Sequence, residues 1–255
     1  MGKDSVTMLY LISMAFPKDC IPDKFNFYHL DTGLKYPEMY KFRDKISKDW
    51  GIKIQPIQYL EYIQKTSPQK DIFECCNLRK TDTLKRLIKE EKLDGVMTAI
   101  RRDEMYERNI ERFFSPRKGG NWDILKEKSE EEKKTGDSDF TYLQDMEMSG
   151  WSLYASDFGK ECDHIRIHPI LDWTERDVWD YVKEKNIPVV DLYFAKNGKR
   201  FRSLGCVPCT HPIDSNASNI DEIIEELKTT EILERAGRQL DKEKIQRRLR
   251  QLGYM

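Results

Sequence analysis

The four residues at positions 2–5 combine the groups that bind a polyphosphate. Gly2 supplies a flexible backbone, Lys3 a cation, and Asp4 and Ser5 a carboxylate and a hydroxyl. They precede an apolar stretch with helical spacing, so their backbone N–H groups are expected at a helix N-terminus, where anions bind. An ordinary helix start capped by Asp4 and Ser5 has the same composition. The tetrapeptide is a weak signal alone, and it does not match the eight-residue Walker pattern.

Three more polar side chains follow apolar runs that predict strands. Asp31 comes after the run 25–30, and Arg101 and Arg102 come after the run 95–100. Ligands of open α/β sheets bind beyond the carboxyl ends of the strands, so these residues are candidates for ligand binding. For the two arginines, a solvated surface pair is the alternative.

Four of the six cysteines form two close pairs. Cys75 and Cys76 are adjacent, and Cys206 and Cys209 form a C-x-x-C motif. Four thiolates suit a [4Fe–4S] cluster or, as the second choice, a tetrahedral zinc ion. Four free thiols packed in a core are the alternative without a metal. Six unevenly spaced cysteines do not form a disulfide framework.

The elements that must position these residues alternate between helix and strand. Helices are predicted from Lys3, at 37–50, at 81–92 and from the N-cap Thr174, and strands at 25–30, 52–55, 95–100 and 165–170. The strand at 52–55 is expected to stop at Pro56. This order favours an α/β fold with a doubly wound, mostly parallel sheet. A strand usually precedes the first helix of such a fold, so we expect the natural chain to begin upstream.

The chain is predicted to hold one domain with a tail. Residues 1–215 form the nucleotide-binding α/β domain, and residues 216–255 form a helical C-terminal region that packs on it, with an amphipathic helix over 220–252. Residues 118–150 are rich in Lys, Glu, Gly, Ser and Asp and cannot bury apolar surface. We predict that they form a mobile insertion.

Charge and hydropathy exclude several classes of partner. The 44 Lys and Arg nearly cancel the 45 Asp and Glu, so no global field points to nucleic acid or to an anionic membrane. No apolar run approaches the roughly 20 residues of a membrane helix. The N-terminus lacks a charged leader followed by an apolar stretch. We therefore expect a cytoplasmic protein.

The motifs occur together in an order that resembles a known family. The phosphate loop is followed by Leu30-Asp31-Thr32-Gly33, by Arg101-Arg102-Asp103-Glu104, by the Trp-Thr-Glu-Arg-Asp-Val-Trp segment 173–179 and by the tail segment 234–238. The chain is similar to the ATP-hydrolysing small subunit of bacterial heterodimeric sulfate adenylyltransferase. That family lies within the superfamily of phosphoadenylyl-sulfate reductases and N-type ATP pyrophosphatases. The resemblance covers 2–254 except the charged insertion.

The resemblance implies a fold, a reaction and a partner. The fold is that of the adenine nucleotide α-hydrolases. The reaction is ATP plus sulfate giving adenylyl sulfate and pyrophosphate, with Mg²⁺ bridging the phosphates. Because its equilibrium lies toward ATP, family members couple to a GTPase large subunit, and such a partner is expected here.

The resemblance also implies roles for the residues singled out above. Gly2, Lys3, Asp4 and Ser5 would hold the β- and γ-phosphates, and Asp31 and Gly33 would border the adenosine. Arg101 and Arg102 would neutralise charge near the α-phosphate and the attacking anion, so that Lys3, Arg101 and Arg102 are the predicted catalytic residues.

The cysteines keep other functions open. Cys75, Cys76, Cys206 and Cys209 resemble the cluster-binding pattern of adenylyl-sulfate reductases and depart from the usual sulfate adenylyltransferase subunit. No cysteine follows Cys209, so a reductase would lack its C-terminal nucleophile. Three alternatives follow: a reductase-family protein, an ATP pyrophosphatase for sulfur insertion of the DNA phosphorothioation type, and a non-enzymatic cluster-bearing scaffold or redox sensor. Nucleic acid is an expected partner only for the sulfur-insertion enzyme.

Overall fold

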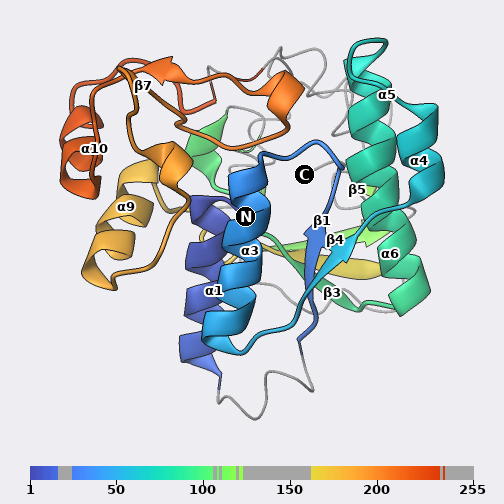
Figure 1. Cartoon of the computed structure of the whole chain (residues 1–255). Coiled ribbons are helices and arrows are strands. Elements are labelled where there is room, and N and C mark those ends of the chain that lie inside the picture. The colour runs from blue at the N-terminus through green and yellow to red at the C-terminus, as the bar shows by residue number, and fades with distance from the viewer. Residues whose placement is uncertain are drawn as a thin grey trace, which may run out of the picture.

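The computed structural model describes residues 1–16, 25–105, 108, 111–118, 121–122, 162–235 and 238. Figure 1 shows α1 and α3 side by side at the centre, with α4, α5 and α6 to one side and α9 and α10 to the other. Among these residues, no helix is both long and apolar enough to cross a membrane.

The first unit consists of two helices and two parallel strands. It comprises α1 (Lys3–Ala15), β1 (Phe27–Leu30), α3 (Pro37–Trp50) and β2 (Ile54–Ile57). Helix α3 has its predicted bounds because Pro occupies its first turn and Gly51 ends it with a left-handed backbone, φ 65°. The strands pair in parallel, and β1 leads directly into the loop that carries Asp31.

Strand β2 departs from its prediction, because Pro56 lies inside the strand and does not stop it. Pro56 pairs with His29 of β1. The carbonyl of Ile57 accepts a hydrogen bond from the Asp31 amide at 2.9 Å, so the neighbouring Pro56 turns its nitrogen to the opposite edge. Within the described part of the chain β1 is the only partner of β2, so that edge needs no donor from Pro56.

A run of short helices joins the two main sheets. It comprises α4 (Leu60–Lys65), α5 (Ile72–Cys76), a π-helical turn (Asn77–Asp82) and α6 (Thr83–Glu91). Helix α6 confirms the helix predicted at 81–92. The wide turn was not predicted, and it follows the adjacent cysteines at the end of α5 directly. Such turns are rare and are frequent at functional sites.

The second sheet has the strand order β3-β6-β4-β5. Strands β3 (Gly95–Met97) and β6 (His164–Ile167) are parallel, whereas β4 (Phe114–Lys118) is antiparallel to both β6 and β5 (Asn121–Trp122). The predicted α/β class with parallel strands is confirmed, and the antiparallel strands β4 and β5 extend this sheet. The insertion predicted from 118 begins in this β4–β5 hairpin, and its residues 123–150 lie outside the described part of the chain.

The C-terminal part begins with a well-capped helix. Thr174 caps α9 (Glu175–Glu184) by accepting from the Asp177 amide, as its sequence predicts. Strands β7 (Lys199–Arg200) and β8 (Ile213–Asp214) then form an antiparallel pair. Short 3-10 turns lie at Arg102–Glu104, Asp191–Tyr193 and Val207–Cys209.

The predicted C-terminal helix is much shorter than expected. Helix α10 (Ile220–Glu226) ends after seven residues, and residues 227–235 are not helical. The prediction of helix across this stretch is wrong because two β-branched residues, Thr229 and Thr230, follow the helix and favour its end. The rest of the predicted helix, 239–252, lies outside the described residues.

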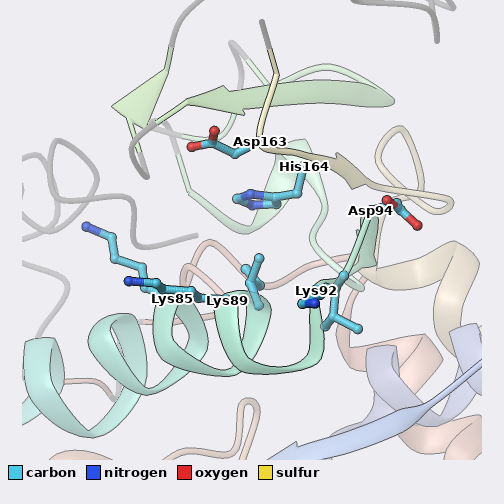
Figure 2. Close-up of a pocket in the computed structure, with 8 residues that line it drawn as sticks. Lys85, Lys89, Lys92, Asp94, Asp163 and His164 are labelled. Atoms are coloured by element: carbon cyan, nitrogen blue, oxygen red, sulfur yellow. The ribbon is translucent and has the colours of Figure 1, made fainter. Parts of the chain in front are cut away.

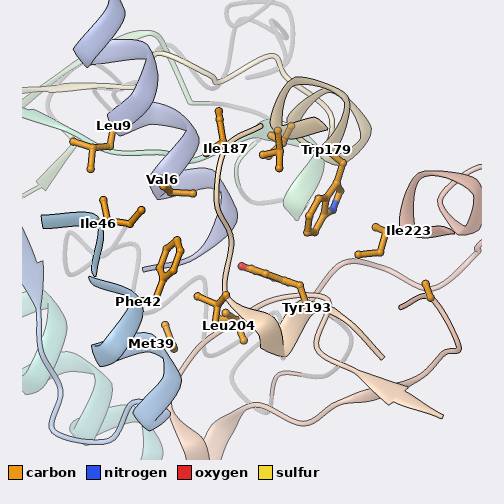
Figure 3. Packing of buried hydrophobic residues seen from close by; sticks show 14 of the residues in the cluster. Val6, Leu9, Met39, Phe42, Ile46, Trp179, Ile187, Tyr193, Leu204 and Ile223 are labelled. Carbon is orange, nitrogen blue, oxygen red and sulfur yellow. The ribbon is translucent and has the colours of Figure 1, made fainter. Parts of the chain in front are cut away.

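The main core lies between α1, α3 and α9. Val6, Ile46, Val178, Trp179 and Ile223 are among its fully buried side chains. Figure 3 shows Trp179 and Tyr193 between the α1 side and the Ile223 side of this cluster. The core therefore supports the N-terminus of α1, where the phosphate loop was predicted.

Candidate functional site

The N-terminus of α1 packs against Tyr193. Gly2 is the N-cap residue, and neither Asp4 nor Ser5 caps the helix through its side chain. The backbone N–H of Lys3 donates to the Tyr193 hydroxyl at 2.8 Å. A Cβ atom at Gly2 would stand 3.1 Å from that hydroxyl, so glycine permits this close approach. Ser5 is exposed, which leaves its hydroxyl on the solvent side of the loop.

Lys3 and Arg101 meet in a buried ionic cluster. Both side chains are 0% exposed. Lys3 Nζ lies 3.3 Å from Asp4 Oδ2 and also contacts Glu234 Oε1. Arg101 Nε donates to Asp4 Oδ1 at 2.8 Å, and its Nη2 donates to Glu234 Oε2. Two cations thus share two carboxylates at the start of α1.

The charges of this cluster stabilise one another. Burial opposes the ammonium form of Lys3, but Asp4 and Glu234 outweigh it and raise the pKa of Lys3 above its ordinary value. Burial likewise opposes the charged form of Glu234, but Lys3 and Arg101 outweigh it and lower the pKa of Glu234. Lys3 and Glu234 are therefore both ionised near neutral pH.

Arg101 is linked to the start of α9. Asp103 accepts from Arg101 Nη1, and its second oxygen accepts from the Glu175 amide at 2.6 Å. Glu175 Oε2 accepts from Arg202 Nε at 2.8 Å. Burial, reinforced by the Glu234 charge, raises the pKa of Glu175. The position of Arg101 thus depends on the first turn of α9.

Arg102 does not join this cluster, although the sequence predicts the two arginines as a pair. Arg102 Nη1 donates to Asp172 Oδ1. Its Nη2 donates to the Glu111 carbonyl at 2.8 Å. The side chain is 22% exposed, in contrast to the fully buried Arg101. The structure therefore brings Lys3, Asp4 and Arg101 together and directs Arg102 elsewhere.

Asp31 and Gly33 shape the loop after β1. Asp31 Oδ1 accepts from the Gly33 amide and from the Tyr40 hydroxyl, each at 2.8 Å. Gly33 has φ 70°, and a Cβ atom there would stand 2.9 Å from the Gln58 side-chain nitrogen. The loop thus requires glycine at this position, and α3 fixes the Asp31 carboxylate through Tyr40.

The four paired cysteines are buried in one neighbourhood. Each is at most 7% exposed. Cys206 Sγ lies 3.1 Å from Thr32 Oγ1, so the C-x-x-C motif packs against the loop after β1. Burial and the nearby thiols of Cys206, Cys76 and Cys75 raise the pKa of Cys209 to about 11. The two pairs, distant in sequence, are therefore neighbours in the fold.

Cations surround this group of thiols. Despite burial, the charges of Lys35 and Lys80 and the Thr32 hydrogen bond lower the pKa of Cys206. Arg79 is buried beside them and donates to the Thr32 carbonyl at 2.8 Å. Within the described residues, no three His, Cys, Asp or Glu side chains converge as a single-ion site. Four cysteine thiolates are the donor type both of a [4Fe–4S] cluster and of a tetrahedral zinc ion.

A cavity of about 470 Å³ lies away from these groups. It is lined by Lys85 and Lys89 of α6, by Lys92 at the end of that helix, and by Asp163 and His164 where β6 begins. Figure 2 shows the lysines on the helix below His164. Nucleotides bind at the carboxyl ends of parallel strands, and this cavity adjoins their amino ends. It is therefore not the nucleotide site.

His168 is a buried residue rather than a base. It is 1% exposed, and its Nδ1 lies 2.6 Å from the Arg112 carbonyl. Burial lowers the pKa of His168 to about 3, so the ring is neutral near pH 7.

This pKa shift predicts a loss of stability in acid. The unfolded chain binds a proton near pH 6.5 and the folded one only near pH 3, so the His168 contribution is present above pH 6.5 and is lost as the pH falls toward 3. Between pH 7 and 5 the loss is roughly 2 kcal/mol. Urea unfolding at both pH values should show a smaller pH dependence in His168→Gln. An equal dependence in variant and wild type would contradict this.

The comparisons with known proteins agree with the motif order. The family model described as the phosphoadenosine phosphosulfate reductase domain matches residues 1–212. The chain belongs to this family. This reductase-domain chain is also 32% identical to sulfate adenylyltransferase subunit 2 of Sulfurimonas denitrificans, over 94% of this chain and 82% of that protein. For the subunit of Escherichia coli O157:H7 the identity is 30%, over 95% and 83%. The predicted resemblance is confirmed.

A solved structure supports the fold of this phosphoadenosine phosphosulfate reductase domain. FMN adenylyltransferase of Candida glabrata, in complex with FMN and an ATP analogue, matches with a TM-score of 0.52 at 15% identity. The match covers 93% of this chain and 78% of that one. At this identity the likeness concerns the fold alone, and it agrees with the predicted adenine nucleotide α-hydrolase fold.

Sequence reasoning missed two residues at the centre of the site. Glu234 lies in the tail segment 234–238, which contributed to the family resemblance without an assigned role. Tyr193 belongs to a 3-10 turn that no motif marked. The tail segment was therefore the available signal for Glu234, whereas Tyr193 had none.

Proposed function

We propose that this chain is the ATP-cleaving subunit of a sulfate adenylyltransferase, which converts ATP and sulfate to adenylyl sulfate and pyrophosphate. The observation that carries the proposal is the meeting of Lys3 and Arg101 at the N-terminus of α1. A helix N-terminus with two buried cations suits the pyrophosphate part of ATP. The choice of reaction rests on the relatives named sulfate adenylyltransferase subunit 2.

In this proposal, different residues bind different parts of the two substrates, ATP and sulfate. Gly2, Lys3, Asp4 and Ser5 would hold the β- and γ-phosphates, and Asp4 would be the carboxylate available to a Mg²⁺ ion, which would neutralise phosphate charge. Arg101 would lie next to the α-phosphate. Arg102, which contacts Asp172 and the Glu111 carbonyl, would have to leave these partners to reach the sulfate. Asp31 and Gly33 border the adenosine.

The chemistry requires no protein nucleophile. A sulfate oxygen attacks the α-phosphorus and forms the new P–O bond, while the bond between the α-phosphorus and the bridging oxygen breaks. The electron pair of that bond leaves with pyrophosphate, where Lys3 and the α1 N-terminus stabilise its charge. Positioning the sulfate in line and neutralising its charge supply the rate enhancement.

The four cysteines are proposed to hold a [4Fe–4S] cluster. The four cysteines would supply thiolate ligands to the iron atoms. The cations around the cysteines would offset the negative charge of the cluster. Cys206→Ser is expected to remove most of the iron and the visible absorption of anaerobically purified protein. Cys162→Ser is the matched control, because Cys162 is not one of the four paired cysteines. It lies just before β6, and its thiol contacts the His164 carbonyl. Equal iron in both variants would contradict the cluster.

The proposal includes a partner and a location. A GTPase large subunit would couple GTP hydrolysis to a reaction whose equilibrium lies toward ATP. The name of the relatives, subunit 2, supports a second subunit. The cytoplasm, where ATP and GTP are available, is the proposed location.

One experiment separates this function from its alternatives. Anaerobically purified protein, alone and with a GTPase large subunit, is assayed for pyrophosphate release from ATP with and without sulfate. Sulfate-dependent release supports the adenylyltransferase. Iron with ATP cleavage that sulfate does not affect would favour sulfur insertion, the alternative that the four buried cysteines support. Iron without ATP cleavage would leave the scaffold or redox sensor.

A further inference from the structure

We infer that the Glu234 carboxylate occupies the place of an ATP phosphate in the nucleotide-free protein, and that the polyphosphate must displace it to bind. This inference rests on the proposed function, because it concerns the same phosphate loop. It makes Glu234 a residue that determines which ligands can enter the site.

The contacts of Glu234 are those that a phosphate would make. Its Oε1 contacts Lys3 Nζ and its Oε2 accepts from Arg101 Nη2, so one planar anion bridges two cations. Phosphate oxygens bind lysine and arginine by the same charge-assisted hydrogen bonds. The carboxylate is 5% exposed, and it is thus a buried anion at a helix N-terminus.

Lys3 and Arg101 are so deeply buried that part of the protein must move before ATP can reach them. The side chains of Lys3 and Arg101 are both 0% exposed, so a polyphosphate has no access to either cation. Asp4, the other carboxylate of the cluster, is part of α1 itself. Glu234, in contrast, lies in a segment without helix or strand. Displacing Glu234 leaves the helix and its loop intact.

The residues just before Glu234 are exposed, whereas Glu234 and Arg235 are buried. Ile232 and Leu233 are 46% and 75% exposed. Arg202 donates to the Ile232 carbonyl, and Arg235 Nη1 lies 3.5 Å from Glu104 Oε2. Exposed apolar side chains do little to hold a segment in place, so the ion pairs of Glu234 are a main attachment of this one. A ligand that replaces these ion pairs therefore frees the segment while the core under α1 stays packed.

Charge balance then selects the ligand. Removing Glu234 alone would leave Lys3 and Arg101 buried without this counter-ion, which is strongly unfavourable. A ligand that brings its own negative charge to the same position cancels that cost. Di- and triphosphates do so, whereas a neutral nucleoside does not. The site thus discriminates against adenosine through the exchange of one anion for another.

Binding of the non-cleavable analogue AMPCPP with Mg²⁺ tests the inference by calorimetry. Glu234→Gln removes the competing charge, so the Kd is expected to fall about 10-fold relative to wild type. Glu231→Gln is the control, because this exposed residue lies three positions earlier and its change removes the same charge. Its Kd should equal that of wild type. Equal or weaker binding by Glu234→Gln would overturn the inference.

Hydrogen exchange of the wild-type protein gives a second readout that needs no variant to fold. AMPCPP should increase exchange in residues 231–235, while adenosine should leave it unchanged. Protection of this segment by AMPCPP would overturn the displacement, because the segment would then close on the nucleotide. If AMPCPP binds neither wild type nor variants, the proposed function fails. If it binds without either effect, only the inference fails.

Discussion

Replacement of Lys3 by methionine is expected to lower sulfate-dependent pyrophosphate release by roughly 10²- to 10³-fold, the usual cost of losing a group that stabilises transition-state charge. The size of this effect follows from the position of Lys3 in the fold. Lys3 is fully buried at the start of α1, next to Arg101, where a low local dielectric strengthens each charge. The rate is measured at saturating ATP, with the proposed GTPase subunit present.

The single substitution also leaves Glu234 without one of its two cations, so a loss of folding must be separated from a loss of catalysis. Lys3→Met combined with Glu234→Gln removes both charges of this ion pair, which limits the destabilisation. Its thermal midpoint should lie nearer to wild type than that of Lys3→Met, while its activity stays low. Recovery of activity in the double variant would refute the role of Lys3.

Replacement of Trp179 by alanine is expected to lower the free energy of unfolding by about 3–5 kcal/mol, the range for a large aromatic side chain lost from a core. Trp179 is 0% exposed, and its ring packs edge-to-face on Tyr193 with centroids 5.3 Å apart. Tyr193 in turn accepts the hydrogen bond from the Lys3 amide. Urea unfolding measures the loss, and nucleotide affinity should fall with it.

Trp179→Phe is the matched control for this prediction. The Trp179 indole N–H has no hydrogen-bond partner among the described residues, so phenylalanine removes volume without breaking a polar contact seen there. Its cost should be clearly smaller than that of alanine, and nucleotide affinity should stay close to wild type. Equal losses for the two variants would show that the packing against Tyr193 is not what stabilises this region.

Local signals explain which elements could be predicted. Helix α3 was predicted with both bounds because Pro37 and Gly51 mark its ends, and Thr174 marked the start of α9. Strand β1 followed from its apolar run. The helix start at Lys3 was also clear, because the stretch after it contains neither Gly nor Pro. In each case the residues that form the element also carry its boundary signal.

Features that depend on distant partners could not be predicted in this way. Pro56 is compatible with β2 only because one edge of that strand lacks a partner among the described residues. Arg101 and Arg102 are adjacent in sequence, yet Glu234 draws one inward and Asp172 holds the other near the surface. No local pattern encodes such a choice. The clustering of the four cysteines was expected from their pairing, but the cations around them were not.

The phosphate loop precedes its partners by a long stretch of chain. The contact of Lys3 with Tyr193 spans 190 positions, and that with Glu234 spans 231. Pairings of such long separation pay a large loop-closure cost and form late in folding. On the ribosome, the loop therefore stays without its Glu234 counter-ion until the segment around Glu234 has been synthesised. Formation of this ionic cluster would then mark a late step in the folding of this site.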